Sequence, residues 1–427
     1  MSSSIIQSHL DHINIPIHKI GQNLGLLRKN ITQLKTNINE KDLVINYNKT
    51  KINNKQHYTT LNILKYLNNN KLLNLEHYSN AEQYEFTNLI NHNNNLELGK
   101  WINNNGTDIM TQSNYLANSH QIPPRLYNSH IDINVLNNFV ELNILDYLFN
   151  KLEYTHKYNI SYKNLTINLV IYSKKKITKT LLNGILTRII TIGLFKSQHT
   201  KIVINVDIFL TQFKKLMNKD TNILGPREIN SGFAEINKKI CIFRSEELNK
   251  VLVHELIHYL DLDLHYVDFE DFYNFFNISP NQKVLLNEAY TEIIAILINS
   301  IIDSPNITSN RTILNNELKF SFYQVAKILI FYDFTDANEF FQANTNTKFK
   351  QKTSIFSYFI VKTILLYNLN TFLELYYKKQ INRGNFKELI LKLIDAKFIK
   401  IVNKFMVYIK THKQNYTLYN TLQMTYN

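Results

Sequence analysis

A short run of histidine and glutamate inside an apolar stretch constrains this chain more than any other feature. Residues 251–263 read VLVHELIHYLDLD and contain the pattern H-E-x-x-H, from His254 to His258. Residues four apart lie on one face of a helix, so both imidazole rings can offer a nitrogen atom to one ion. Three leucines with the same spacing predict that this helix packs into a core: Leu248, Leu252 and Leu256.

The motif predicts a metal site with a base beside it. Neutral imidazole suits Zn2+. Glu255 follows the first histidine and would lie near the ion but outside its ligands, where it can accept a proton from an activated water. The alternative is two hydrogen-bonded helix histidines around a solvated glutamate, which the apolar flanks disfavour because buried rings need partners. We expect Ser245 to cap this helix, with Glu246 and Glu247 in its first turn.

A zinc site of this kind needs a third protein ligand. His265 is close, but in H-E-x-x-H-x-x-G-x-x-H the third histidine would stand one residue earlier, and Asp261 occupies the glycine position. The other candidate is the segment NEAYTE at 287–292, where Glu288 and Glu292 share one face of an apolar helix. Two ordinary surface glutamates remain the alternative interpretation of this segment.

The second helix has clear boundary signals. Ser279 is a plausible cap, Pro280 suits the first helical position, and Gln282 completes an S-x-x-Q capping box. The sequence Asp303-Ser304-Pro305 marks its end. We therefore expect a helix over 280–302.

The rest of the chain predicts an α+β fold with a small mixed sheet, one edge strand of which packs on the H-E-x-x-H helix. We expect strands at 165–172, 201–210, 230–236 and 239–243, and helices at 136–154 and 178–195. Beyond 280 every strong period is helical, at 320–331, 354–366 and 386–410. We expect three regions: a mainly helical, Asn-rich 1–125, an α+β lobe over 126–265, and a helical lobe over 266–427.

Composition limits the remaining classes of function. The single cysteine, Cys241, excludes a disulfide scaffold, and we find neither a signal peptide nor an apolar run of membrane-spanning length. We expect an intracellular protein, not secreted, without membrane contact. The formal charge is +14, but Asn, Lys, Ile and Tyr are abundant together, as AT-rich codons produce. We therefore interpret the basicity as diffuse and expect no specific nucleic-acid site.

The motif and the glutamate helix together resemble a known family. HELIH followed by NEAYTE is similar to the gluzincin, or thermolysin-type, zinc metallopeptidases. The resemblance covers residues 165–300 and implies Glu288 as the third zinc ligand and Glu292 as the partner of His254. The segment NSGFA at 230–234 resembles the edge strand on which a peptide substrate lies, which implies substrate contacts at Gly232 and Phe233.

The resemblance also suggests an origin and a reaction. With its AT-rich composition, the chain is similar to metallopeptidases of large DNA viruses, which would place it in the host cytoplasm or the virion. We expect a zinc metalloendopeptidase with a peptide or protein substrate and Glu255 as general base. Tyr358 is a candidate for stabilising the oxyanion. Two alternatives stay open: a basic structural or nucleic-acid-associated protein with a degenerate or structural zinc site, and hydrolysis of a non-peptide amide.

Overall fold

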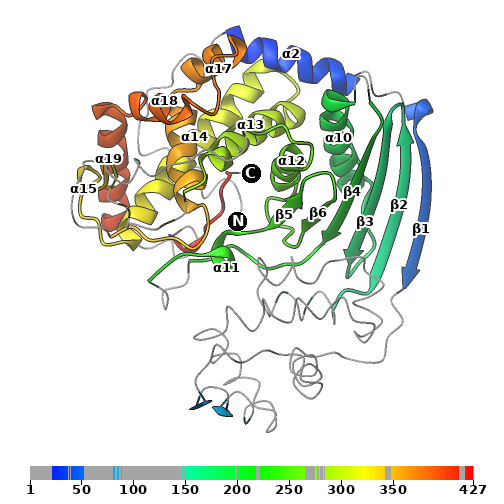
Figure 1. The fold of residues 1–427 in the computed structure, drawn as a ribbon, viewed down its shortest axis with the longest axis horizontal. Coiled ribbons are helices and arrows are strands. Elements are labelled where there is room, and N and C mark those ends of the chain that lie inside the picture. Colours follow the sequence, from blue (N-terminus) through cyan, green and yellow to red (C-terminus); the bar gives the residue numbers. More distant parts are fainter. Residues whose placement is uncertain are drawn as a thin grey trace.

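The computed structural model describes residues 22–36, 40–51, 151–197, 200–217, 222–264, 284–341, 348–412 and 419–426, with isolated positions between them. A mixed six-stranded sheet packs against helices and continues into a mainly helical lobe (Figure 1). The expected α+β class is confirmed at this level. Of the predicted helix at 136–154, the structure describes Ile144 and Tyr147, which are helical, and residues 151–154, which are not; Tyr154 begins a strand.

The sheet has the order β1-β2-β3-β4-β6-β5, and β5 is an edge strand. Its strands are β1 (Val44–Lys51), β2 (Tyr154–Tyr162), β3 (Leu165–Ser173), β4 (Ile202–Phe209), β5 (Gly232–Glu235) and β6 (Lys239–Ile242). The four expected strands are all present. Neither β1 nor β2 was expected from the sequence. For β1 the reason is that the strand is exposed along its whole length and shows no apolar alternation.

The sheet and two helices enclose one of the hydrophobic cores. α10 (Lys179–Lys196) crosses between the parallel strands β3 and β4, and the Thr178 side chain caps it by accepting from the Leu181 N–H at 3.2 Å. α12 (Leu248–Tyr259) packs beside α10. The three leucines of the α12 stripe lie in this core with apolar residues of β3, β4 and β6. The α12 helix is therefore buried, as the leucine spacing predicts.

The helical lobe begins with α13 (Leu286–Asp303) and α14 (Ile307–Phe331). The helix expected at 354–366 starts instead as a π-helix, η3 (Phe356–Val361), and continues as α16 (Lys362–Tyr367). The helix expected at 386–410 is two helices, because the Asp395 side chain caps a new one by accepting from the Phe398 N–H at 2.7 Å. The remaining helices of the lobe are α15 (Asn338–Phe341), α17 (Leu369–Tyr377), α18 (Phe386–Lys392) and α19 (Ala396–Thr411).

Three further elements complete the described fold. α2 (Gln22–Thr36) packs across α10, α13 and α17, and its Arg28 donates to the hydroxyl of Ser304 at 2.7 Å. η1 (Glu40–Asp42) leads into β1, and α11 (Pro226–Ile229) precedes β5. Across the described helices, none combines the length and apolar character needed to cross a membrane.

The starts of α12 and α13 differ from the prediction. α12 begins at Leu248 after Glu247, whose φ of 59° is left-handed, and no side chain caps it, so the expected Ser245 cap is wrong. Glu246 and Glu247 are instead held by buried partners outside the helix. α13 begins at Leu286, because the Gln282 side chain accepts from the Gln351 N–H at 2.6 Å rather than capping a helix. The other two start signals, Ser279 and Pro280, lie outside the described residues.

Candidate metal centre

Two neighbouring helices bring the histidines and glutamates together. α12 and α13 pack side by side and run in opposite directions, since His258 lies beside Glu288 and His254 lies beside Glu292 (Figure 1). The four-residue spacing on each helix places all four side chains in the interface between them. The helical periods put each pair of side chains on one face of its helix, and the packing of α12 on α13 pairs them as the family resemblance implies.

Three of these side chains converge on one point. The Nε2 atoms of His254 and His258 lie 3.1 Å apart, and each is 3.3 Å from Oε2 of Glu288. Four-coordinate zinc with bonds of about 2.0–2.2 Å spaces its ligand atoms roughly 3.3–3.5 Å apart. Two imidazole nitrogens and one carboxylate oxygen are also a donor set that zinc prefers. Among the described residues, this is the group of histidine and acidic side chains arranged to hold a metal ion.

The outward ring nitrogens of both histidines contact carboxylates. Nδ1 of His254 lies 2.9 Å from Oε2 of Glu292, and Nδ1 of His258 lies 2.7 Å from Oδ2 of Asp263. Such contacts fix the ring orientation and leave Nε2 free to bind a metal. Glu292 lies where the family resemblance implies. Asp263, the partner of His258, is not among the site residues expected from the sequence, although it stands only five residues after that histidine.

The charges of the cluster shift the pKa values of its members. Burial lowers the pKa of His254, but hydrogen bonds to Glu288 and Glu292 outweigh it and leave that pKa raised. Burial also lowers the pKa of His258, but the charge of Glu288 outweighs this effect and leaves that pKa well above its usual value. Burial raises the pKa of Glu288, but the charges and hydrogen bonds of the two histidine rings outweigh this effect. The pKa of Glu288 therefore lies well below its usual range. Without a metal the two histidines therefore hold their protons more tightly beside an ionised Glu288, and a bound cation would displace those ring protons.

Glu255 lies next to this group without contributing to it. It lines the same cleft and packs against Gly232 of the edge strand β5. Burial raises the pKa of Glu255, and the nearby His254 and His258 rings oppose that effect without cancelling it. A carboxylate with a raised pKa beside a metal site is suited to accept and return a proton.

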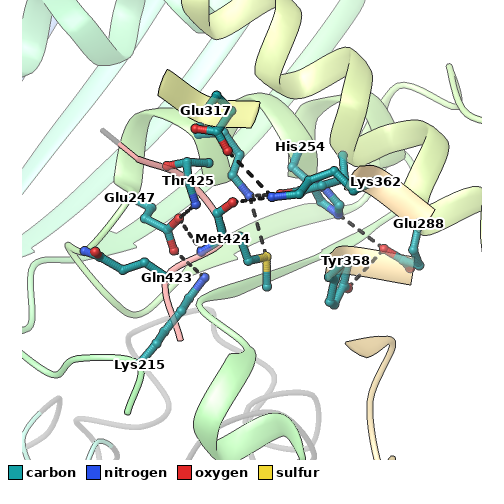
Figure 2. A network of polar contacts seen from close by, with 12 residues as sticks. Lys215, Glu247, His254, Glu288, Glu317, Tyr358, Lys362, Gln423, Met424 and Thr425 are labelled. Atoms are coloured by element: carbon teal, nitrogen blue, oxygen red, sulfur yellow. Dashed lines mark hydrogen bonds and ion pairs between the residues drawn. The ribbon is translucent and has the colours of Figure 1, made fainter. Parts of the chain in front are cut away.

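Tyr358 enters the site from the helical lobe. Its hydroxyl donates to Oε2 of Glu288 at 3.0 Å, and its ring centroid lies 5.9 Å from that of His254 (Figure 2). It belongs to the π-helix η3, which the Ser357 hydroxyl anchors by donating to the Leu285 carbonyl at 2.6 Å. Single π turns occur frequently at functional sites because they re-aim a side chain. Tyr358, the tyrosine singled out from the sequence, therefore lies beside His254 and Glu288.

The group of His254, His258 and Glu288 lines a cleft of about 660 Å³. The edge strand β5, with Gly232, Phe233 and Ala234, and the segment 351–354 both line this cleft. The Thr353 hydroxyl donates to Oδ1 of Asn230 at 3.0 Å. Both predicted substrate contacts, Gly232 and Phe233, therefore lie in this cleft. His265, the other candidate ligand, lies outside the described residues.

Comparisons with known proteins give one relative and no family. The chain is 32% identical over 205 residues to a protein of Acanthamoeba polyphaga mimivirus whose name says only that it is uncharacterised. The match covers 45% of this chain, and the chain spans about half, 52%, of the relative. No family model and no solved structure matches. The relative supports the expected link to large DNA viruses at this coarse level.

Proposed function

We propose that the chain is a zinc-dependent metallopeptidase, with His254, His258 and Glu288 as the zinc ligands. The observation that carries the proposal is the triangle of two Nε2 atoms and one carboxylate oxygen, 3.1–3.3 Å on a side, open to a cleft. The resemblance of HELIH and NEAYTE to the gluzincin peptidases supports the same assignment. Zinc bound there would polarise the scissile carbonyl and lower the pKa of the attacking water.

Glu255 is the general base in this proposal. Its carboxylate takes the proton of the attacking water and passes it to the nitrogen of the leaving amine. Packing against Gly232 holds the carboxylate at the floor of the cleft, beside the metal ligands. Burial raises the pKa of Glu255, which makes its carboxylate a stronger base for the first transfer, from the attacking water.

Tyr358 stabilises the oxyanion. Its hydroxyl donates to Oε2 of Glu288, so it lies beside a proposed zinc ligand. In this role the hydroxyl turns from Glu288 to the developing negative charge, and such a donor lowers the barrier most when it is already in place. The π turn and the Ser357 anchor provide such placement.

The edge strand favours a peptide over a small amide as the substrate. β5 pairs with β6 on one side only, so its other edge can add an extended peptide through backbone hydrogen bonds. Residues of this strand and of the segment 351–354 line the same cleft of about 660 Å³. A non-peptide amide would leave the edge strand unused.

Metal analysis with a peptide-library digest tests the proposal. Purified protein should carry about one zinc per chain and cleave internal peptide bonds. The His254→Ala and His258→Ala variants should lose both properties. Full zinc content in the double variant would contradict the site. Steeply salt-dependent nucleic-acid binding without peptide cleavage would favour the basic structural protein instead.

A further inference from the structure

The polar stripe on α12 continues beyond the two histidines. Lys250, His254 and His258 are spaced four residues apart and face α13 in succession. The Lys250 ammonium bonds Oε1 of Glu292, whose other oxygen lies 2.9 Å from Nδ1 of His254. The Lys250 and Glu292 side chains are 3% and 0% exposed. A continuous chain of contacts therefore leads from Lys250 through Glu292 to a metal ligand.

A buried segment near the end of the chain closes the space around Lys250. The segment 420–426 contacts α12 here, since Sδ of Met424 lies 3.6 Å from the Lys250 ammonium. The N–H groups of Met424 and Thr425 donate to Glu247 at 2.8 and 2.6 Å. The Met424 carbonyl accepts from Lys362 at 2.5 Å. These contacts hold the segment against Lys250, whose side chain is therefore almost fully buried.

This confinement matters for the orientation of the histidine ring. A carboxylate that contacts only one imidazole can rotate and pull the ring with it. The two oxygens of Glu292 are divided between Lys250 and His254, so rotation would break a buried ion pair. Loss of one partner from such a pair is strongly unfavourable. Lys250 thus holds the Glu292 carboxylate in place, and the carboxylate in turn orients the His254 ring.

We propose that Lys250 is a positioning residue of the metal centre, which orients His254 through Glu292 and so sets the affinity of the site for zinc. This inference rests on the proposed zinc site. Lys250 does not touch the reacting atoms, and its effect is expected in metal binding before any effect on turnover.

Zinc affinity measured by chelator competition tests the role. Lys250→Met keeps the length of the apolar stem but removes the charge, and should weaken zinc binding about 10–100-fold, as the loss of outer partners of a ligand does. Lys250→Arg should recover part of the loss. The matched control is Lys327→Met, since Lys327 is also fully buried against the same segment but bonds the Thr421 carbonyl rather than a carboxylate.

A double-variant cycle separates positioning from a purely structural effect. In a Glu292→Gln background, the added Lys250→Met change should lower zinc affinity little further, because its route to His254 is already cut. The same comparison applies if Lys250→Met alone fails to fold, since the double variant removes both buried charges. In metal-free protein, the proton resonance of the His254 Nδ1–H···Glu292 bond should be present and should shift in Lys250→Met.

The outcomes separate the two proposals. Equal zinc affinity in Lys250→Met, Lys327→Met and wild type would overturn the positioning role and leave the peptidase proposal standing. A Lys250→Met loss of the same factor in both backgrounds would also overturn it. Wild-type protein without zinc affinity would overturn the metal site itself, and the positioning role with it.

Discussion

Gly232 and Glu255 pack so closely that no side chain fits between them. A Cβ atom at position 232 would lie 3.3 Å from Cγ and Oε1 of Glu255 and 2.9 Å from the backbone carbonyl oxygen of Cys241. The carbonyl belongs to the paired strand β6 and cannot move alone. The glycine therefore lets the edge strand approach Glu255.

Gly232→Ala should displace β5 or the Glu255 side chain. We expect a loss of about 1–3 kcal/mol in the free energy of unfolding, the range for overpacking. Peptidase activity should fall on the order of 10²-fold, since small misplacements of reacting groups cost that much. Gly184→Ala on α10 is the control, because its Cβ would meet side-chain atoms only at 3.6 and 3.7 Å. Equal activity in the two variants would contradict the close approach as the reason for glycine.

The two glutamates of α13 should respond differently to removal. Glu288→Ala should abolish tight zinc binding, because Oε2 of Glu288 is the third corner of the ligand triangle. Glu292→Ala should leave zinc bound but reduce affinity or activity roughly 10–100-fold, as the loss of a histidine partner does. Chelator competition on both variants measures the order. The reverse order would exchange the two roles, and negligible effects from both would move the search for a third ligand to His265.

Much of this site was predictable from the sequence, for a physical reason. Residues four apart meet on one face of any helix, so the HELIH and NEAYTE segments fixed which side chains could face each other. The apolar period fixed that α12 would be buried. Neither inference needs information about distant parts of the chain.

The missed features depend on contacts between distant segments. The ion pair of Glu247 with Lys215, and the backbone donors of residues 424–425, reset the start of α12. The strand β1 pairs with β2 across a long separation in sequence, and its exposed residues show no period. Nothing in the local sequence marks Lys250, because its partner Glu292 lies on another helix.

Tyr358→Phe tests the proposed oxyanion donor. The change removes the hydroxyl that donates to Glu288 and keeps the ring that packs beside His254. We expect kcat to fall about 10²–10³-fold with zinc still bound and KM little changed, the scale for losing one such donor. Steady-state kinetics with zinc analysis on the same sample measures this. A rise in KM with normal kcat would instead assign Tyr358 to substrate binding.

The buried Lys327 predicts a pH dependence of stability that does not involve the proposed metal ligands. Burial holds the pKa of Lys327 well below its usual value, so the unfolded chain binds this proton more tightly than the folded one. The folded state should therefore gain stability as pH rises from the lowered folded pKa towards the unfolded value of 10.5, with a limiting slope of about 1.4 kcal/mol per pH unit.

Lys327→Met should remove that component. Denaturant unfolding of both proteins, in steps from pH 7 to pH 10, should show the wild type gaining stability relative to the variant. Lys404→Met, at an exposed position on α19, is the control and should follow the wild-type curve. Parallel curves for wild type and Lys327→Met would mean that the ammonium is not buried in the folded protein.

The central claim is that Glu255 acts as the base of a zinc peptidase without binding the metal. The most direct test measures peptide cleavage and zinc content together in wild type and Glu255→Gln. The glutamine keeps the size of the side chain but cannot accept the proton. We predict about one zinc per chain in both proteins and a fall in cleavage of at least ~10²-fold in the variant. Near-normal cleavage by Glu255→Gln, or no cleavage of any peptide by zinc-loaded wild type, would contradict the account.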